Sequence, residues 1–298
     1  MPVSIQFQIT PCVSKIIGVQ PKSVLDVGCG FGKWGYLCRE YLDAFHGRFR
    51  PEDWTTRIDG VEFFEPYILD HQRALYSNIM IGDIRDLIDG LDDYDLIIAG
   101  DVIEHLHKDE AEVIVEKLYN KARKMLIVNI PLGTGWDHPE QYGNTAELHR
   151  SEWYQEDFAP YSDEFAHFEL PTGIKYGAFF CEKPRSVEDR AAGLATAGNF
   201  YLGRREIEVA ERYARRAIAL APNRPEGTLV LANLQIEQGN IQEALRSLEA
   251  GVESNPADCM LRLYLAQLHH SLGNKMGAMD LVTAVLATPG LHEEQRRD

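Results

Sequence analysis

The sequence of 298 residues lacks several features that would assign it to particular classes of protein. Its five cysteines are scattered and show no Cys-x-x-Cys spacing, so we expect reduced thiols. No run of 18 apolar residues occurs, so we expect no transmembrane helix and no membrane partner. The N-terminus has neither a basic region nor an apolar stretch, so we expect no signal peptide and a cytoplasmic protein.

Basic residues are also scarce. The chain has 30 Lys and Arg against 46 Asp and Glu, a formal net charge of −16, and residues 1–184 hold 17 of the basic and 31 of the acidic residues. Nucleic-acid binding depends mainly on Lys and Arg contacts to phosphate. We therefore expect no nucleic-acid partner, and most of the acidic charge serves solubility.

The most informative segment is residues 24–35, which reads VLDVGCGFGKWG. Its first apolar residues predict a short buried strand, and Lys33 opens a predicted helix. Between them, Gly28, Gly30 and Gly32 let the backbone pass close to a ligand, and the helix N-terminus offers N–H groups to a negative group. We expect a nucleotide-like cofactor at the carboxyl end of this strand.

Two kinds of cofactor fit this turn. Gly30-x-Gly32-x-x-Gly35 matches the dinucleotide fingerprint, which on its own is a weak signal. A dinucleotide site also needs an acid about 20 residues past the glycines, whereas the candidate Glu62 lies 30 residues past Gly32. Residues 47–56 read as an insertion, so the spacing alone leaves both cofactors open.

The acids around this turn provide a second signal. The string Asp26-x-Gly28-x-Gly30-x-Gly32 resembles motif I of class I S-adenosylmethionine (SAM) methyltransferases. Three further predicted strands, residues 57–62, 79–83 and 94–101, each end in an acid, as in that family. Glu-His-Leu then follows at 104–106, which is common among its small-molecule and glycan methyltransferases.

This resemblance covers about residues 20–185 and implies SAM as the cofactor. It implies that Glu62 binds the ribose hydroxyls, since carboxylate oxygens accept both O–H groups, and that Asp83 accepts a hydrogen bond from the adenine amino group. The cofactor-binding residues implied are Asp26, Gly28, Gly30, Gly32, Glu62, Phe63, Asp83, Ile84 and Asp101.

The same resemblance implies an α/β fold for residues 1–185. We expect a Rossmann-like, seven-stranded, mostly parallel sheet with helices on both faces. Residues 123–131 and 176–181 are predicted to form its fifth and last strands.

After residue 185 the strand patterns end and a 34-residue period begins. Ala210, Ala244 and Ala278 are 34 residues apart. This is the period of the tetratricopeptide (TPR) repeat, a helix–turn–helix unit. This period predicts that residues 186–298 form an all-α domain, in which about three TPR-like repeats occupy about residues 190–290. Gln235 and His269 stand where the first repeat has Tyr201, which weakens the case for a peptide-binding groove.

The segment between the fifth and last strands is the expected acceptor side. A helix is predicted from Asn144 to Trp153. Aromatic residues are dense here, and they either wall a sugar or planar ring or pack a small core of their own: Trp136, Tyr142, Trp153, Tyr154, Phe158 and Tyr161.

A hydroxyl or amine acceptor can need a general base, for which histidine suits neutral pH. The candidates are His105 after the fourth strand and His149 in the acceptor segment, with His138 as a third. A metal held by Asp101, His105 and His107 is disfavoured, because helix positions two apart do not share a face. We therefore predict no metal, and we interpret Glu104 as an acid at a helix start.

The sequence thus predicts a SAM-dependent methyltransferase that acts on an oxygen of a small molecule or glycan precursor. Two alternatives stay open: a protein methyltransferase whose TPR repeats recruit the target, and an interaction scaffold with a vestigial methyltransferase domain. The intact acids argue against the scaffold. The apolar last repeat helix, residues 275–287, predicts a homodimer, unless residues 289–298 fold back over it.

Overall fold

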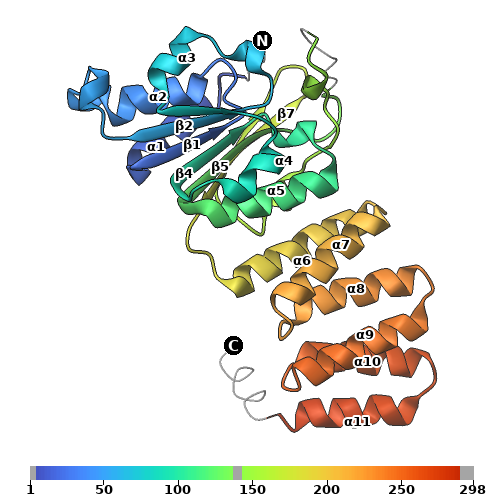
Figure 1. The fold of residues 1–298 in the computed structure, drawn as a ribbon. Coiled ribbons are helices and arrows are strands. Elements are labelled where there is room, and N and C mark those ends of the chain that lie inside the picture. The colour runs from blue at the N-terminus through green and yellow to red at the C-terminus, as the bar shows by residue number, and fades with distance from the viewer. Residues whose placement is uncertain (1–4, 137–142, 289–298) are drawn as a thin grey trace. The chain divides into compact units, whose positions relative to one another are not determined.

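A computed structural model describes residues 5–136 and 143–288. The chain divides into two compact units, Met1–Pro184 and Arg185–Asp298 (Figure 1). Among the residues that the model describes, no helix is both long and apolar enough to cross a bilayer.

The first unit is built on one seven-stranded sheet with the strand order β3-β2-β1-β4-β5-β7-β6 (Figure 1). Neighbours among β1 to β5 pair in parallel, and β7 pairs antiparallel with both β5 and β6. The predicted mostly parallel sheet is therefore confirmed. The strands are β1 (Ser23–Val27), β2 (Arg57–Glu62), β3 (Asn78–Ile81), β4 (Tyr94–Gly100), β5 (Ala122–Leu132), β6 (Phe165–Glu169) and β7 (Lys175–Glu182).

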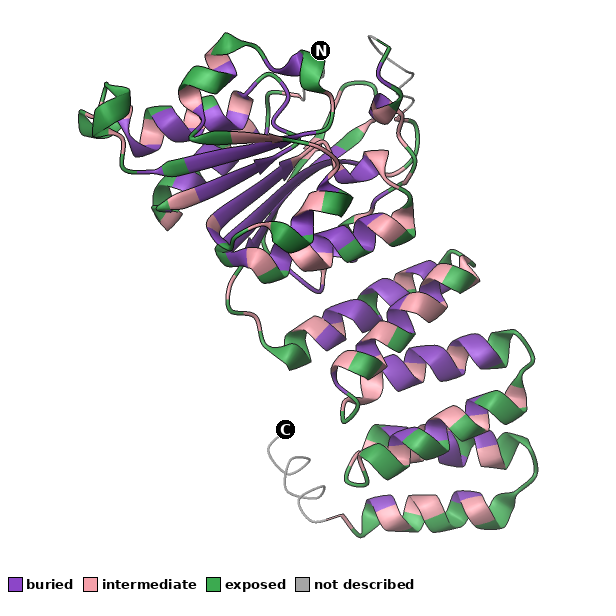
Figure 2. Cartoon of the chain, in the orientation of Figure 1, coloured by how far each residue is buried: buried purple, intermediate pink, exposed green. Residues whose placement is uncertain are grey.

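Helices cover both faces of this sheet, as predicted. Alternate residues of a strand point to opposite faces, and in β4 Leu96 packs with α1 to α3 whereas Ile97 packs with α4 and α5. Because both faces are covered, the central strands are buried almost throughout (Figure 2). The helices are α1 (Ile9–Val19), α2 (Lys33–Leu42), α3 (Asp70–Leu75), α4 (Ile84–Leu87) and α5 (Lys108–Lys121).

The register of the parallel strands places their carboxyl ends level with one another. Val27 of β1 pairs with Val61 of β2 on one side and with Ala99 of β4 on the other, and Glu62 pairs with Ile81 of β3. The loops that leave these four strands therefore start at one edge of the sheet, which is where open α/β sheets bind ligands.

The second unit consists of helices that repeat every 34 residues. Ala210, Ala244 and Ala278 are buried, in α7, α9 and α11. A Cβ atom on Gly198 would lie 3.1 Å from Val230 Cγ1, so this position requires a small residue. The helices are α6 (Val187–Gly203), α7 (Ile207–Leu220), α8 (Pro225–Glu237), α9 (Ile241–Ser254), α10 (Cys259–Ser271) and α11 (Lys275–Leu286).

Candidate functional site

The turn from β1 to α2 has a backbone that requires glycine. Gly28, Gly30 and Gly32 have φ angles of +68°, +49° and +87°, in the left-handed region that other residues rarely adopt. A Cβ atom on Gly28 would lie only 2.3 Å from Cγ2 of Val102, which follows β4. The turn is therefore packed tightly against the end of the neighbouring strand, and its backbone is exposed to the cavity beyond.

Asp26 lies behind this turn and supports it. Its Oδ2 accepts a 2.5 Å hydrogen bond from the Tyr76 hydroxyl, which in turn accepts one from the Gly35 N–H. Burial raises the pKa of Asp26 to about 7. Asp26 does not line the cavity, and neither does Gly32, which caps α2. The Tyr76 hydroxyl occupies the space beside Asp26, and contact of Asp26 and Gly32 with the cofactor stays a prediction.

A cavity of about 340 Å³ opens at the carboxyl ends of β1, β2, β3 and β4. Most of the residues that the sequence assigned to a cofactor line it, although they come from four separate strand ends. This lining includes Gly28, Gly30, Glu62, Phe63, Asp83, Ile84, Asp101 and His105.

The Glu62 side chain is held by two backbone N–H groups from different loops. Its two carboxylate oxygens accept hydrogen bonds from the Gly30 N–H (2.9 Å) and the Phe64 N–H (2.8 Å). Burial raises the pKa of Glu62, while these backbone donors lower it. Because each oxygen carries a second lone pair, the fixed carboxylate can still accept from two hydroxyl groups.

Asp83 faces the same cavity as an ionised acceptor. It accepts the backbone N–H of Arg85 at 2.8 Å and pairs with the Arg85 guanidinium at 2.7 Å. These hydrogen bonds hold the pKa of Asp83 below its usual value. Arg85 also lines the cavity and pairs with Glu110 at 2.9 Å, a contact that no sequence pattern indicated.

Asp101 ends the series of acids after β4. It has a positive φ of 56°, and its Oδ1 accepts a 2.7 Å hydrogen bond from the Tyr176 hydroxyl of β7. Burial and the Asp101 carboxylate together raise the pKa of Tyr176 well above its usual value. Tyr176 therefore stays protonated and holds Asp101 in place at the cavity wall.

His105 and His149 come together although 44 residues separate them. Their ring centroids lie 5.0 Å apart, and the Nδ1 of His105 lies 3.3 Å from the carbonyl oxygen of Leu148. His149 lines a second hollow of about 260 Å³, which Gly133 and Trp136 also line. Both candidate bases thus lie beside the cofactor cavity, whereas His138 lies outside the described residues.

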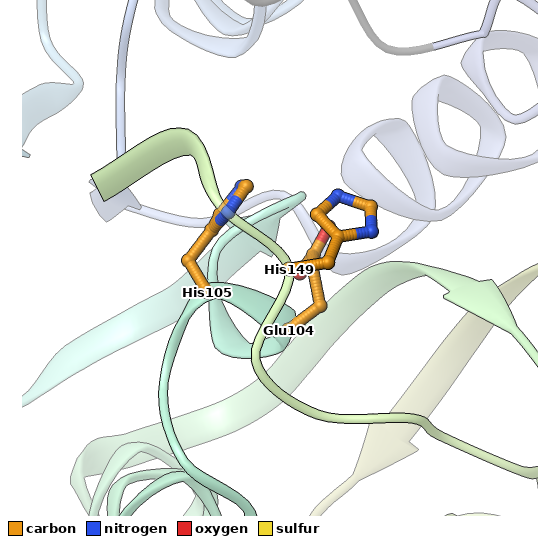
Figure 3. Close-up of side chains that lie close together, drawn as sticks. All are labelled: Glu104, His105 and His149. Carbon is orange, nitrogen blue, oxygen red and sulfur yellow. The ribbon is translucent and has the colours of Figure 1, made fainter. Parts of the chain in front are cut away.

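Glu104 corrects one of our interpretations. It does not start a helix: it lies in a 3₁₀ turn, Ile103–His105, and α5 begins only at Lys108. Its side chain is buried beside the two histidines, and it lines the second hollow (Figure 3). Burial and the nearby Asp101 carboxylate raise the pKa of Glu104 well above its usual value.

The helix predicted for residues 144–153 is wrong. The structure describes all of these residues and shows one 3₁₀ turn, Thr145–Glu147, with an extended segment after it. The N–H groups of Arg150 and Ser151 donate to the carbonyl oxygen of Glu104 at 2.8 and 3.1 Å, so they are not available to a helix. This tertiary pairing places His149 next to Glu104.

Three of the six aromatic residues of this segment pack a core instead of walling a pocket. Trp153, Phe158 and Tyr161 are buried in the hydrophobic core beside α5. Trp136 lines the second hollow and donates its indole N–H to the carbonyl oxygen of Lys175 at 2.9 Å. Tyr142 lies outside the described residues.

Several residues that no sequence pattern indicated also line the cofactor cavity. Tyr67 donates a 3.0 Å hydrogen bond to Glu147, which also accepts from Asn144 at 3.2 Å, and all three line the cavity. Asn144 and Glu147, which lie where a helix was predicted, instead belong to this polar cluster.

No protein-family model matches the sequence, and no curated protein matches it either. Solved structures do match. TehB from Haemophilus influenzae is 16% identical, with a TM-score of 0.43; the match covers 61% of this chain and 64% of the length of TehB. Magnesium protoporphyrin IX methyltransferase from Synechocystis PCC 6803, solved with bound SAM, is 14% identical, with a TM-score of 0.40; the match covers 61% of this chain and 87% of that one.

Two further solved structures are also similar. Burkholderia thailandensis 1,6-didemethyltoxoflavin-N1-methyltransferase is 17% identical, with a TM-score of 0.43; the match covers 60% of this chain and 79% of that one. MamA is 15% identical, with a TM-score of 0.31, and the match covers 38% of this chain and 68% of MamA. Similarities this weak do not assign a function. A proposed function must therefore rest on the geometry of the site.

Proposed function

We propose that the protein is a SAM-dependent methyltransferase that acts on an oxygen of a small molecule or glycan precursor. The observation that carries this proposal is the convergence of four strand ends on one cavity. The glycine turn, Glu62, Asp83 and Asp101 all line it. Together they offer backbone N–H groups and three carboxylates at separate points, which suits an adenosine joined to a cationic methionine.

The strand order of the sheet favours SAM over a dinucleotide. Antiparallel β7 lies between β5 and β6, whereas the common dinucleotide-binding sheet has the strand order 3-2-1-4-5-6. The spacing to Glu62 does not decide between them, because the segment between α2 and β2 contains two short 3₁₀ turns, Ala44–His46 and Pro51–Asp53, and an insertion there accounts for the long spacing.

The cavity suggests one direction for the cofactor. Adenine lies at Asp83 and Ile84, where Phe63, 54% exposed, offers a ring face. The ribose lies at Glu62. The methionine end then lies between Gly28 and Asp101, so that the methyl group points toward His105.

The acceptor occupies the second hollow, beside His149. Methyl transfer is an in-line displacement that needs the acceptor oxygen about 3–3.5 Å from the methyl carbon. His105 and His149 are placed to promote loss of the acceptor's proton, either as a general base or through a bound ion.

The Glu62→Ala variant tests the cofactor assignment. Truncation leaves the ribose hydroxyls without an acceptor, so we expect SAM affinity to fall by about 1–3 kcal/mol, roughly 5- to 150-fold. Isothermal titration calorimetry with SAM and, separately, NAD measures this. The exposed Glu65, three residues further on, gives the matched control Glu65→Ala, which should bind SAM normally. Normal SAM binding by Glu62→Ala, or tight NAD binding by the unmodified protein, would contradict the assignment.

We further propose that the TPR-like repeats associate, most simply as a two-fold dimer. On α11, Met276, Met279 and Leu286 are 78%, 66% and 57% exposed, and contiguous apolar surface on a protein usually marks an interface. Figure 2 shows how much of this last helix is exposed. The alternative cap, residues 289–298, lies outside the described residues.

Light scattering tests this dimer. We expect the full chain to be dimeric at micromolar concentration, and the double variant Met276→Lys with Met279→Lys to be monomeric, because it places charge in the apolar contact. Met260 on α10, which is 52% exposed, provides the control Met260→Lys, which should stay dimeric. A monomeric full chain would exclude the dimer, and a dimer that survives the double variant would place the contact elsewhere.

A further inference from the structure

Three potential metal ligands meet beside the cofactor cavity. The carboxylate of Glu104 and the imidazole nitrogens of His105 and His149 include one ligand atom from each residue that all lie within 4.8 Å of one another. Figure 3 shows the three side chains at one place, with His149 reaching it from a separate segment of chain. Atoms that each bind one ion at about 2.0–2.2 Å lie at most about 4.4 Å apart, so small movements of these side chains would bring all three onto a single ion.

Glu104 is a buried acid whose side chain has no hydrogen-bond donor among the described residues. Its side chain is 1% exposed, and neither carboxylate oxygen has a hydrogen-bond partner among the described residues. A buried carboxylate with no donor is costly unless it is protonated, paired or bound to a metal. The carboxylates of Asp101 and Glu147 add negative charge close to Glu104, so the surroundings attract a cation.

The histidines are held in orientations that suit metal binding. A carbonyl oxygen can only accept, so the Nδ1 of His105 donates to Leu148 and the ring carries its lone pair on Nε2. A ligating histidine usually donates its other nitrogen to the protein in this way. The backbone next to His149 is held in place, since the Arg150 N–H donates to the Glu104 carbonyl oxygen, and the His149 ring lies against the His105 ring.

We propose that Glu104, His105 and His149 bind one divalent transition-metal ion of the zinc or cobalt class, which binds an oxygen of the methyl acceptor. Two imidazoles favour such ions over magnesium, which prefers carboxylates and water. Three protein ligands leave a coordination position open, as catalytic metal sites do. The role of the ion, though not its binding, rests on the methyl transfer proposed above.

The position of the cluster fits this role. His105 lines the cofactor cavity, Glu104 and His149 line the second hollow, and Arg150 lines both. An ion here would bind an acceptor hydroxyl between the cofactor cavity and the second hollow. It would lower the pKa of that hydroxyl, so that the hydroxyl proton passes to solvent. The oxygen then attacks the methyl carbon of SAM, and the carbon–sulfur bond breaks with its electron pair staying on sulfur. The products are a methyl ether and S-adenosylhomocysteine.

Metal binding can be measured without any acceptor. Tag-free full-length protein is stripped with a chelator, dialysed, and titrated with Zn²⁺, Co²⁺, Mn²⁺ or Mg²⁺ in a calorimeter, with Co²⁺ also followed by its visible absorption. We expect one transition-metal ion per chain and binding of Mg²⁺ at least about 10-fold weaker. Absence of saturable transition-metal binding, or a preference for Mg²⁺, would overturn the proposal.

Variants locate the ion. Glu104→Gln and His149→Ala should weaken metal binding by more than the roughly 10- to 100-fold that loss of an outer hydrogen-bond partner costs. His107→Ala, two residues from His105 but outside the cluster, is the matched control and should bind metal normally. Normal metal binding by both cluster variants would overturn the site.

Thermal unfolding separates loss of the ion from loss of the fold. Without metal, Glu104→Gln should unfold at the same temperature as the unmodified protein or higher, because it removes a buried carboxylate but keeps its shape. Added Zn²⁺ should raise the unfolding temperature of the unmodified protein and not of this variant. An equal rise in both would overturn the site.

Calorimetry with SAM keeps the two proposals distinguishable. Metal binding at Glu104, His105 and His149 without SAM binding would leave this inference standing and overturn the proposed function. SAM binding without metal binding would overturn this inference and leave the proposed function standing.

Discussion

The His149→Ala variant is expected to lose about 10²–10⁴-fold in turnover while SAM binding persists, because losing the group that promotes proton loss from the acceptor costs that much. His149 lines the second hollow and not the cofactor cavity. A loss of turnover with normal SAM affinity would therefore place the acceptor, and not the cofactor, at this histidine. His105→Ala should lose as much turnover, although His105 also lines the cofactor cavity.

The measurement begins with a screen of hydroxylated small molecules and sugar derivatives for acceptors that cause release of S-adenosylhomocysteine. Turnover of the variants is then measured with the best acceptor, and SAM affinity by calorimetry. The control is His46→Ala, an exposed histidine in a 3₁₀ turn far along the chain from the site, which should keep full turnover. Near-normal turnover in both His149→Ala and His105→Ala would mean that the protein acts by positioning alone, and both roles would be withdrawn.

The sheet could be predicted closely from the sequence, because a parallel strand that is covered on both faces is a short apolar run. Residues 57–62 were predicted as a strand with the bounds that β2 has. The acids at the strand ends could also be located, since in a parallel sheet they lie at one edge. Glu62, Asp83 and Asp101 do line one cavity.

Asp26 shows where that reasoning stops. Its place two residues before the first glycine suggested contact with the cofactor, but the contact depends on which side chain fills the space beside it. Tyr76, 50 residues further along the chain, occupies that space and takes the carboxylate as a hydrogen-bond acceptor. A partner so distant in sequence leaves no local pattern.

The cluster of Glu104, His105 and His149 was missed for a related reason. A metal was considered only among near neighbours, Asp101, His105 and His107, where helix geometry separates the two histidine side chains. His149, the proposed third ligand, comes from a segment that was predicted to be helical. That segment is extended because its N–H groups pair with the Glu104 carbonyl oxygen, and this long-range backbone pairing overrides the local helix preference.

Gly28→Ala is the other change with a large expected effect. A positive φ costs any residue with a Cβ about 1–2 kcal/mol, and the new methyl group would lie 2.3 Å from Val102 Cγ2. Forcing extra atoms into a packed site costs about 1–3 kcal/mol more. We therefore expect a loss of about 2–5 kcal/mol in the free energy of unfolding and, because the turn must shift, a clear loss of SAM affinity.

Gly47→Ala separates the two causes of that loss. Gly47 has a φ of +79° and no described atom within 4 Å of the added Cβ, so this variant should lose only the backbone cost and bind SAM normally. Urea unfolding followed by tryptophan fluorescence measures both variants, and it reports on residues 1–184 because all four tryptophans lie there. Adding Val102→Ala to Gly28→Ala removes the methyl group that clashes, and should recover SAM affinity and about 1–3 kcal/mol of stability relative to the sum of the single changes. If Gly28→Ala behaved like Gly47→Ala, or if the double variant showed no coupling, the close approach of the glycine turn to Val102 would not govern this site.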